Sequence, residues 1–355
     1  MSQHAVLAPP RPLVTGPSAW IGAELARRPE EWVVPFAPAH LAEIAAAVAG
    51  VRARGLDIAD IRRADFPLPT LGPLLDRLRD EVLNGRGFVL LRGLDVSGPI
   101  ETSAIAYFGI GSYFGSARSQ NAKGHLLGHV RDMGLSSRDP NVRIYQTTER
   151  QNFHTDSCDI VALLCLKTAK SGGLSSLTSS MSVYNRMATE RPDLVARLFN
   201  PLPSDRRGEV PEGKKPWHYC PIYNDYAGYL SAIYAPHYVR SSQRFPDAPR
   251  LTEEDYAALE MFDRTAEDAE LRLDMALRPG DIQFVHNHTI LHDRTAFEDW
   301  PEPERKRHLL RLWLAAPGAR PLPPAYAERY GSVEIGNRGG IICKGTRLHA
   351  PLEPE

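Results

Sequence analysis

The sequence predicts an α+β protein built around an antiparallel sheet core. Helical patterns come first, and short strand patterns with helical insertions follow over the rest of the 355 residues. Thirty prolines and 27 glycines divide the chain into many short elements, which suits turns and strands better than a helical bundle. Helices followed by runs of strands are typical of the α+β class.

Periodicity predicts the individual elements. Apolar residues spaced three to four apart predict helices, and short apolar runs bounded by glycine or other turn residues predict buried strands. A Thr252 to Asp255 capping pattern marks the start of one helix. In chain order, we expect helices at 39–54, 74–83, 103–112, 184–198 and 252–274, strands at 87–93, 142–147, 160–167 and 174–179, a hairpin at 222–234, a turn at 278–281 that enters a strand by residue 284, and a last strand at 307–315.

The composition of the chain argues against a nucleic-acid binder, a membrane-spanning protein and a secreted protein. Lysine and arginine number 42 against 43 acidic residues, so a general nucleic-acid binder is not expected. The sequence has no run of eighteen apolar residues, so a membrane-spanning helix is not expected. The first residues do not resemble a secretion signal. The four cysteines form no C-x-x-C pair, which favours reduced thiols. We expect a cytoplasmic protein with a flexible tail at 1–18 and a single domain at 19–355, carrying an insertion at about 184–275.

The segment 151–159 holds the first candidate site. His154 and Asp156 are separated by one small residue, Thr155. In an extended strand, residues two apart point to the same face, so an imidazole and a carboxylate would project side by side. Two histidines and one carboxylate are the ligand set of non-haem iron oxygenases, which leaves open positions on the metal. This short motif occurs often by chance, and it needs a third ligand.

Candidates for that third ligand lie in the segment 280–299. His286, His288 and His292 all follow an apolar strand pattern there. Spacing alone does not decide which of the three binds a metal, because buried histidines also serve as hydrogen-bonded structural residues.

The strand at 307–315 carries two arginines on one face. Arg307 and Arg311 alternate with apolar residues, and the opposite face is mostly apolar. Two unpaired buried arginines would be costly, whereas surface ion pairs contribute little. A guanidinium binds both oxygens of a carboxylate, so we interpret the pair as carboxylate-recognising residues.

At this point the sequence resembles the taurine catabolism dioxygenase (TauD/TfdA-like) family of iron(II)- and 2-oxoglutarate-dependent dioxygenases. The likeness runs from about residue 74 to residue 317, and the strand at 87–93 fits its start. The ordered set of motifs is specific, although H-x-D alone is weak. The matching segments are His154-Thr-Asp156, Lys170-Ser-Gly-Gly-Leu-Ser175, Asn287-His-Thr-Ile-Leu-His292-Asp-Arg-Thr-Ala-Phe297 and Arg307-His-Leu-Leu-Arg311-Leu-Trp313.

The resemblance implies a double-stranded β-helix, a jelly-roll with N-terminal and inserted helices, together with Fe(II), 2-oxoglutarate and O2. It implies that His154, Asp156 and His292 bind the iron. Arg307 would pair with the distal carboxylate of 2-oxoglutarate. Ser175 would help to hold it, at a position where the family usually has threonine.

Substrate residues are the least constrained part of the expectation. Arg311 stands where some relatives contact an acidic group of the substrate, which suggests a small carboxylate-bearing molecule. Asn121, which follows Gln120 in a polar loop, could line the pocket or form an ordinary turn. The stretch 217–245 could be a substrate wall or a hairpin packed by its own tyrosines.

The expected reaction is hydroxylation, desaturation or cyclisation at an unactivated C–H bond, with release of succinate and CO2. Halogenating relatives replace the carboxylate ligand with a small residue, and the presence of Asp156 argues against that chemistry. The alternatives are a metal-dependent hydrolase and a non-catalytic cupin-like binding protein. The expected partner is a small-molecule substrate, without nucleic acid or membrane. The sequence is compatible with a homodimer, although no residue points to one.

Overall fold

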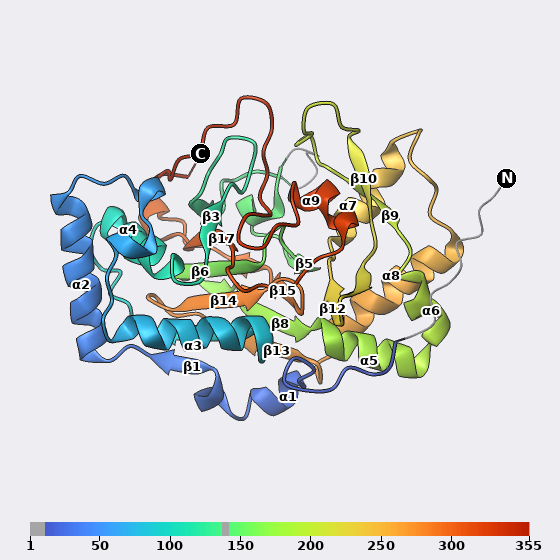
Figure 1. Cartoon of the computed structure of the whole chain (residues 1–355), viewed down its shortest axis with the longest axis horizontal. Coiled ribbons are helices and arrows are strands. Elements are labelled where there is room, and N and C mark those ends of the chain that lie inside the picture. Colours follow the sequence, from blue (N-terminus) through green and yellow to red (C-terminus); the bar gives the residue numbers. More distant parts are fainter. Residues whose placement is uncertain (1–10, 137–141, 355) are drawn as a thin grey trace.

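The structure, a computed structural model, describes residues 11–136 and 142–354. Its largest element is a seven-stranded, mostly antiparallel sheet, and a four-stranded antiparallel sheet faces it (Figure 1). The large sheet has the order β1 (Val33–Pro35), β2 (Phe88–Arg92), β14 (Ile282–His286), β6 (Ile160–Lys167), β17 (His308–Ala315) and β3 (Ser116–Arg118), with β4 (Gly128–Val130) also paired to β17. The smaller sheet has the order β13 (Arg272–Met275), β8 (Ser175–Ser179), β15 (Ile290–Arg294) and β5 (Gln151–His154).

Helices cover the two sheets on opposite sides of the molecule (Figure 1). The N-terminal helices pack on the large sheet, and a second group packs beside the small sheet. The first group is α2 (Pro38–Ala53), α3 (Leu71–Asn84) and α4 (Ile100–Gly111), preceded by the short α1 (Gly22–Leu25). The second group is α5 (Ser180–Glu190), α6 (Pro192–Arg197) and α8 (Glu253–Ala266).

The remaining short elements lie mostly in the region expected as an insertion. They are β9 (Leu202–Asp205) paired with β10 (Trp217–Cys220), β11 (Tyr223–Tyr226) paired with β12 (Tyr229–Ala232), α7 (Pro236–Ser241), α9 (Ala327–Tyr330), and β7 (Ser171–Gly172) paired with β16 (Phe297–Glu298). Helix α9 comes from the C-terminal part of the chain and packs against β10. No helix in the described ranges is long and apolar enough to cross a membrane.

Strand β2 shows how alternation builds the core. Val89 and Leu91 enter the cluster under the N-terminal helices, whereas Phe88 and Leu90 enter the cluster between the two sheets. Every one of these side chains is buried, because successive residues of a strand point to opposite faces and both faces are covered. The continuous apolar run at 87–93 therefore corresponds to a strand inside the sheet, with both faces covered.

Strand β17 follows the same rule. Leu310, Leu312 and Leu314 join the cluster under the helices. Leu309 and Trp313 join the cluster between the sheets. Arg311, between them in sequence, therefore points into the space between the two sheets.

Several sequence-based expectations are confirmed closely. The strand at 160–167 matches β6, and Thr252 accepts a hydrogen bond from the Asp255 amide at the start of α8. The hairpin at 222–234 is present as β11 and β12.

Three expectations need correction. The segment 142–147 contains one 3-10 turn, Ile144–Gln146, instead of a strand. The helix expected at 184–198 divides into α5 and α6, because Pro192 cannot continue the hydrogen-bond ladder. The helix expected at 252–274 ends at Ala266, and the apolar residues that follow it belong to β13.

Residues 1–10 of the expected tail lie outside the described residues. Residues 11–18 contact the rest of the chain. Arg11 donates to the Asp225 carboxylate at 2.5 Å, and the Val14 amide donates to the Asn185 side chain at 2.7 Å.

Candidate metal and co-substrate site

Two histidines face each other across neighbouring strands of the small sheet. His154 on β5 is the direct register partner of His292 on β15, and a register irregularity follows His292. Their ring centroids lie 4.2 Å apart. Antiparallel pairing therefore brings together two residues that are 138 positions apart in the chain.

Asp156 lies beyond the end of β5, so the expectation that it shares a strand face with His154 is wrong. Its position is set by contacts instead of strand geometry. The Asp156 amide donates to Asn287 Oδ1 at 2.9 Å, and the indole nitrogen of Trp313 donates to Asp156 Oδ2 at 2.8 Å. Asn287 also donates to Cys158 Sγ at 3.1 Å, which anchors the loop after the strand.

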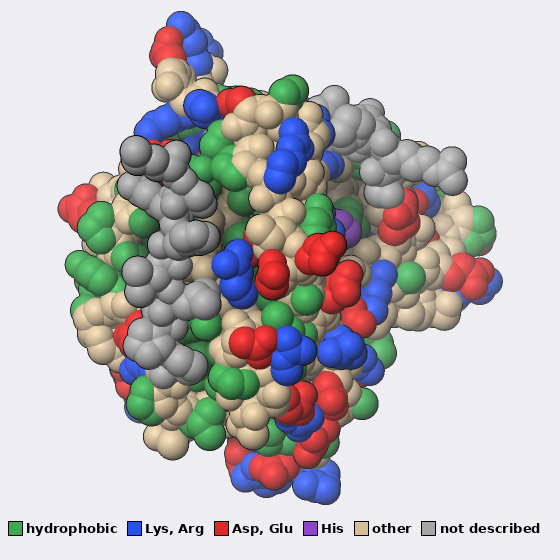
Figure 2. All heavy atoms as spheres, turned by 90° about the vertical axis from the view of Figure 1, so that its right-hand side faces the viewer, with side chains coloured by type: hydrophobic (Ala, Val, Ile, Leu, Met, Phe, Trp, Pro, Cys, Tyr) green, Lys and Arg blue, Asp and Glu red, His purple; other side chains and the backbone are tan. Residues whose placement is uncertain are grey.

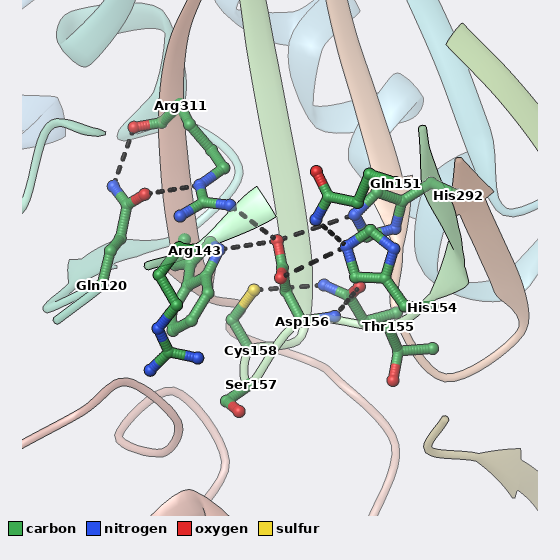
Figure 3. A network of polar contacts seen from close by, with 12 residues as sticks. Gln120, Arg143, Gln151, His154, Thr155, Asp156, Ser157, Cys158, His292 and Arg311 are labelled. Atoms are coloured by element: carbon green, nitrogen blue, oxygen red, sulfur yellow. Dashed lines mark hydrogen bonds and ion pairs between the residues drawn. The ribbon is translucent and has the colours of Figure 1, made fainter. Parts of the chain in front are cut away.

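The three side chains form one cluster of potential metal ligands (Figure 3). His154 Nε2 lies 3.9 Å from Asp156 Oδ1, and His292 Nε2 lies 3.7 Å from Asp156 Oδ2. One ligand atom from each side chain lies within 4.8 Å of the others. Since metal–nitrogen and metal–oxygen bonds to protein ligands are about 2.0–2.2 Å long, one ion between them reaches all three with small shifts.

The hydrogen bonds of His154 determine which nitrogen is available to a metal. His154 Nδ1 lies 2.8 Å from the carbonyl oxygen of Asn152, which can only accept. Nδ1 therefore carries the proton, and Nε2 presents its lone pair toward Asp156 and His292. In the structure this lone pair accepts a hydrogen bond from the side-chain amide of Gln151 at 2.9 Å. The Gln151 side chain therefore lies at the nitrogen that would bind the metal.

The electrostatic surroundings favour the protonation states in which these side chains can bind a metal. Burial opposes the charge of Asp156, but Arg311 and the two histidines outweigh it and hold the Asp156 pKa well below its usual value. Burial and the neighbouring His292 lower the pKa of His154 to about 3. At neutral pH the cluster therefore offers a carboxylate and a neutral imidazole, which are the forms that bind metal.

The two other histidines of the 280–299 segment have different partners. His286 Nδ1 lies 2.9 Å from the Thr289 hydroxyl. His288 Nε2 lies 3.0 Å from Asp159, and both of these side chains are fully buried. Asp159 also accepts from Arg338, so His288 belongs to a buried ionic cluster. Of the three candidates, the structure brings only His292 to Asp156.

A small cavity of about 40 Å3 adjoins the cluster. Arg307 and Ser175 lie in its lining together with His154, His292 and Arg311. Its remaining wall is largely apolar, formed by Val130, Val161, Leu163, Leu277 and Leu309. An apolar chamber with cationic side chains suits a short dicarboxylate.

Arg307 is buried with part of its guanidinium unsatisfied. Its side chain lies over the Phe297 ring, and Nη1 is buried without a hydrogen-bond partner among the described residues. Burial lowers the Arg307 pKa to about 10, so the side chain remains charged at neutral pH. A buried unsatisfied cation is costly, and an anion in the adjoining cavity would offset that cost.

Arg294 is a second buried arginine of this cavity, and it was not singled out from the sequence. It donates to the carbonyl oxygens of Thr147 and Glu149, and its Nε has no described partner. Burial and the charge of Arg307 lower its pKa to about 9. Its sequence signal is its place in the motif Asn287–Phe297, two residues after His292. The unpaired nitrogens of these two neighbouring guanidiniums leave donors for an anion in the cavity.

Arg311 lies beside the candidate metal ligands. Its Nη1 is 3.7 Å from Asp156 Oδ2, and its Nε donates to Gln120 Oε1 at 2.7 Å (Figure 3). The guanidinium packs between the rings of Tyr145 and Trp313. This packing holds the positive charge at the junction between the small cavity and a larger cleft, which both include Arg311.

The structure does not bring Asn121 to the cavity linings. Its side-chain oxygen accepts from the Gly124 and His125 amides, as in an ordinary turn. The preceding Gln120 lines the larger cleft and donates to the Arg311 carbonyl oxygen at 2.8 Å. The side chain from this loop that reaches the site is therefore Gln120.

The larger cleft, of about 840 Å3, opens from the metal ligands. Its lining includes His154, Asp156 and Trp313. The stretch 217–245 contributes to one wall through His218, Ala235, Pro236, His237 and Tyr238. Part of this stretch therefore lines the cleft, and other parts pack as the β11–β12 hairpin.

Two histidines and one carboxylate beside an open cleft define a non-haem metal centre of the oxygenase type. The chain matches the model of the Taurine catabolism dioxygenase TauD, TfdA family over residues 53–313, and it belongs to this family. Its cofactor is therefore iron and its co-substrate 2-oxoglutarate, and the hydrolase and binding-protein alternatives are set aside.

Two curated relatives cover most of the chain. FR-33289 synthase of Streptomyces rubellomurinus is 32% identical over 90% of this chain and 95% of its own length. The taurine hydroxylase-like protein SAT17 of Stachybotrys chartarum is 31% identical over 84% of this chain and 81% of its own.

The fold also matches a solved structure. An asparagine oxygenase in complex with Fe(II), 2S,3S-3-hydroxyasparagine and succinate superimposes with a TM-score of 0.61. The match covers 80% of this chain and 93% of that chain, at 16% sequence identity. At this identity the likeness shows the fold alone.

Proposed function

We propose that His154, Asp156 and His292 hold the iron, and that the enzyme oxidises an unactivated C–H bond of a small acidic molecule. The observation that carries this proposal is the convergence of these three side chains beside a cavity lined by Arg307. Bound iron and 2-oxoglutarate supply the oxidising chemistry: O2 is reduced, 2-oxoglutarate becomes succinate and CO2, and one oxygen atom is left for the substrate.

The residues of the small cavity position the co-substrate. Arg307 binds the distal carboxylate, with the Ser175 hydroxyl beside it and Arg294 as a second cation. Ser175 Oγ donates to Gln283 Oε1 at 3.1 Å, so its single hydroxyl hydrogen has to turn from Gln283 to donate to the carboxylate. The apolar wall excludes water from the co-substrate, which strengthens the pairing with Arg307.

The residues of the larger cleft position the substrate. Arg311 places a charge at the junction of the two cavities, where it attracts an acidic group. The carboxylate of Asp156 occupies the ligand position that halogenating relatives leave to chloride. Hydroxylation, or desaturation or cyclisation, is therefore favoured over halogenation.

The fold supports a finer architectural proposal. The described strands form separate, mostly antiparallel sheets and not a closed barrel. We propose that the two facing sheets are the two layers of a double-stranded β-helix. Residues 19–355 would be a single domain, and the segment at about 184–275 would be an insertion that builds one wall of the cleft.

Succinate formation tests the reaction. The purified protein with Fe(II), 2-oxoglutarate and O2 is expected to release succinate, slowly without substrate and faster with it. The Asp156→Ala variant is expected to release none. Wild-type activity in that variant would contradict the assignment of the metal ligands.

A further inference from the structure

The larger cleft carries an excess of positive charge that the chain as a whole lacks. Its lining contains eight lysines and arginines against five aspartates and glutamates, whereas the whole chain has 42 against 43. On the face in Figure 2, cationic and acidic side chains are interspersed. The excess is therefore a property of the cleft.

Most of the acidic side chains in the lining are already neutralised. Asp156 is the proposed iron ligand, and Glu149 is an exposed residue at the rim. The other three pair with arginines: Asp205 with Arg244 at 3.0 Å, Glu328 with Arg206 at 2.9 Å, and Glu209 with Arg143. These carboxylates therefore do not offset the remaining cations.

Three arginines of the lining form no ion pair with a described residue: Arg118, Arg207 and Arg329. Arg118 donates to the Gly339 carbonyl oxygen at 3.2 Å and to Asn337 Oδ1 at 3.1 Å. Arg329, on α9, donates to the Ser157 hydroxyl at 3.0 Å and to the Thr155 carbonyl oxygen at 3.2 Å. Its charge therefore lies beside the loop that carries Asp156.

Arg207 lies in the loop between β9 and β10. Its backbone has φ of 53°, which is unusual for a residue other than glycine, asparagine or aspartate, and its amide donates to Asp205 at 2.7 Å. The guanidinium Nε is buried without a hydrogen-bond partner among the described residues. The loop thus holds a cation in the lining although nothing in the described chain pairs with it.

His218 adds an unsatisfied polar group to the same wall. It lies on β10, against which α9 packs, and only 8% of it is exposed. Neither ring nitrogen meets hydrogen-bond geometry with a described residue, although the backbone of Ser204 on the paired strand lies close enough to act on the His218 pKa. Burial and the charges of Arg206 and Arg329 lower its pKa to about 3, which keeps the ring neutral and leaves it one N–H to donate.

We propose that this wall binds a dianionic phosphorus oxyanion of the substrate, a phosphate monoester or a phosphonate, through Arg207, Arg329 and His218. This inference rests on the proposed function, because it names the substrate class of the same active site. Arg118 contributes a further positive charge to the cleft.

The number of unpaired donors favours a dianion over a carboxylate. A single carboxylate has one negative charge and two oxygens, and it would leave part of the positive charge in the cleft unmatched. A phosphate or phosphonate carries up to two charges and three terminal oxygens, which suits several arginine and imidazole donors. The volume of about 840 Å3 leaves room for an organic body between this group and the iron.

Binding of matched probes tests the inference. The protein loaded with Fe(II) and 2-oxoglutarate without oxygen is titrated calorimetrically with phenyl phosphate, phenylphosphonate and benzoate, which share a ring and differ in the anion. At least one phosphorus probe is expected to bind about ten-fold or more tightly than benzoate. The stronger of the two identifies the ester or the phosphonate as the source.

Two variants locate the binding group. Arg207→Asn keeps a residue that tolerates positive φ, and Arg329→Gln keeps a donor to the metal-site loop. Each is expected to weaken phosphorus-probe binding about ten-fold, whereas Arg27→Gln, at an exposed arginine outside the cleft, is expected to change nothing. If Arg329→Gln fails to fold, Arg207→Asn still decides the matter.

The outcomes separate this inference from the proposed function. Equal binding of benzoate and the phosphorus probes, binding of none of them, or unchanged affinity in Arg207→Asn would overturn the dianion site. The visible absorption band of iron-bound 2-oxoglutarate is recorded in the same samples. If that band forms, the failure concerns the dianion site alone, whereas its absence would contradict the proposed function.

Discussion

His154 and His292 are direct register partners across the β5–β15 strand pair, with ring centroids 4.2 Å apart. Sheet pairing fixes this relationship, so the two imidazoles are placed before any metal binds. Asp156 completes the set from the loop, held by Asn287 and Trp313. A preorganised ligand set of this kind needs little rearrangement to bind an ion.

Removing a proposed ligand is expected to abolish iron binding. His154→Ala and His292→Ala should each lower iron(II) affinity by more than about 100-fold, because changes in the outer shell alone cost 10–100-fold. Equilibrium dialysis with iron(II) under anaerobic conditions measures the effect. His40→Ala, at a partly exposed histidine of α2 outside both cavity linings, is the control and should bind iron as the wild type does.

Trp313 is expected to raise the affinity for iron(II) through its hydrogen bond to Asp156. Trp313→Phe removes the 2.8 Å hydrogen bond to Asp156 Oδ2 while it keeps an aromatic ring in the core. We expect iron(II) affinity to fall about 10–100-fold with the fold intact. Trp300→Phe, at a partly exposed tryptophan, serves as the matched change. Equal affinities in the two variants would show that the indole bond does not act on the metal.

Arg307 is expected to act on the co-substrate. Arg307→Gln should raise the KM for 2-oxoglutarate at least about ten-fold, because a charge-assisted pairing is lost in a buried cavity. Steady-state succinate release at varied 2-oxoglutarate measures this. Arg305→Gln, an exposed change two residues earlier, should leave the KM as it is. An unchanged KM in Arg307→Gln would remove Arg307 from the co-substrate site.

The absence of a side chain at Gly173 is expected to leave room for the Arg307 guanidinium. Its φ is +68°, and a Cβ added there would lie 3.0 Å from Arg307 Nε. Gly173→Ala should cost about 1–2 kcal/mol of stability and also raise the KM for 2-oxoglutarate. Gly228→Ala has a similar φ of +84° and open space around it, so it should show only the loss of stability. Stability is measured by denaturant unfolding and the KM by succinate release.

Buried histidines are expected to make the metal-free protein less stable in acid. Burial is the main cause that lowers the pKa of His308 and of His218 to about 3 each. The unfolded chain protonates these histidines below about pH 6.5, and the folded chain does not, so the free energy of unfolding falls as the pH drops from about 6.5 toward 3. Each histidine contributes a loss of about 2 kcal/mol between pH 7 and pH 5. Denaturant unfolding at these two pH values should show a smaller loss in His308→Asn than in the wild type.

The sequence predicts which side chains cluster at the candidate metal site better than it predicts their geometry. The H-x-D spacing and the motif around His292 identify side chains that the structure brings together. The reasoning that placed Asp156 on a strand beside His154 fails, because β5 ends at His154 and tertiary hydrogen bonds fix the carboxylate. Spacing along a chain carries no information about such long-range contacts.

The residues of the larger cleft are also set by long-range contacts that the sequence does not predict. Strand alternation at 307–315 predicts that Arg311 shares a face with Trp313, and both contact Asp156. Nothing in the local sequence marks Arg207, His218 or Arg329, because they line one cleft only in the folded chain, where α9 packs against β10. Their relation to the site depends on the three-dimensional arrangement of segments more than a hundred residues apart.

An anaerobic titration of the iron(II) protein with 2-oxoglutarate, followed by visible absorption, tests the proposed function most directly. We predict a weak metal-to-ligand charge-transfer band that saturates with 2-oxoglutarate, and that needs much higher 2-oxoglutarate in Arg307→Gln. A protein that binds iron but develops no band would contradict the proposal that this site holds iron and 2-oxoglutarate together.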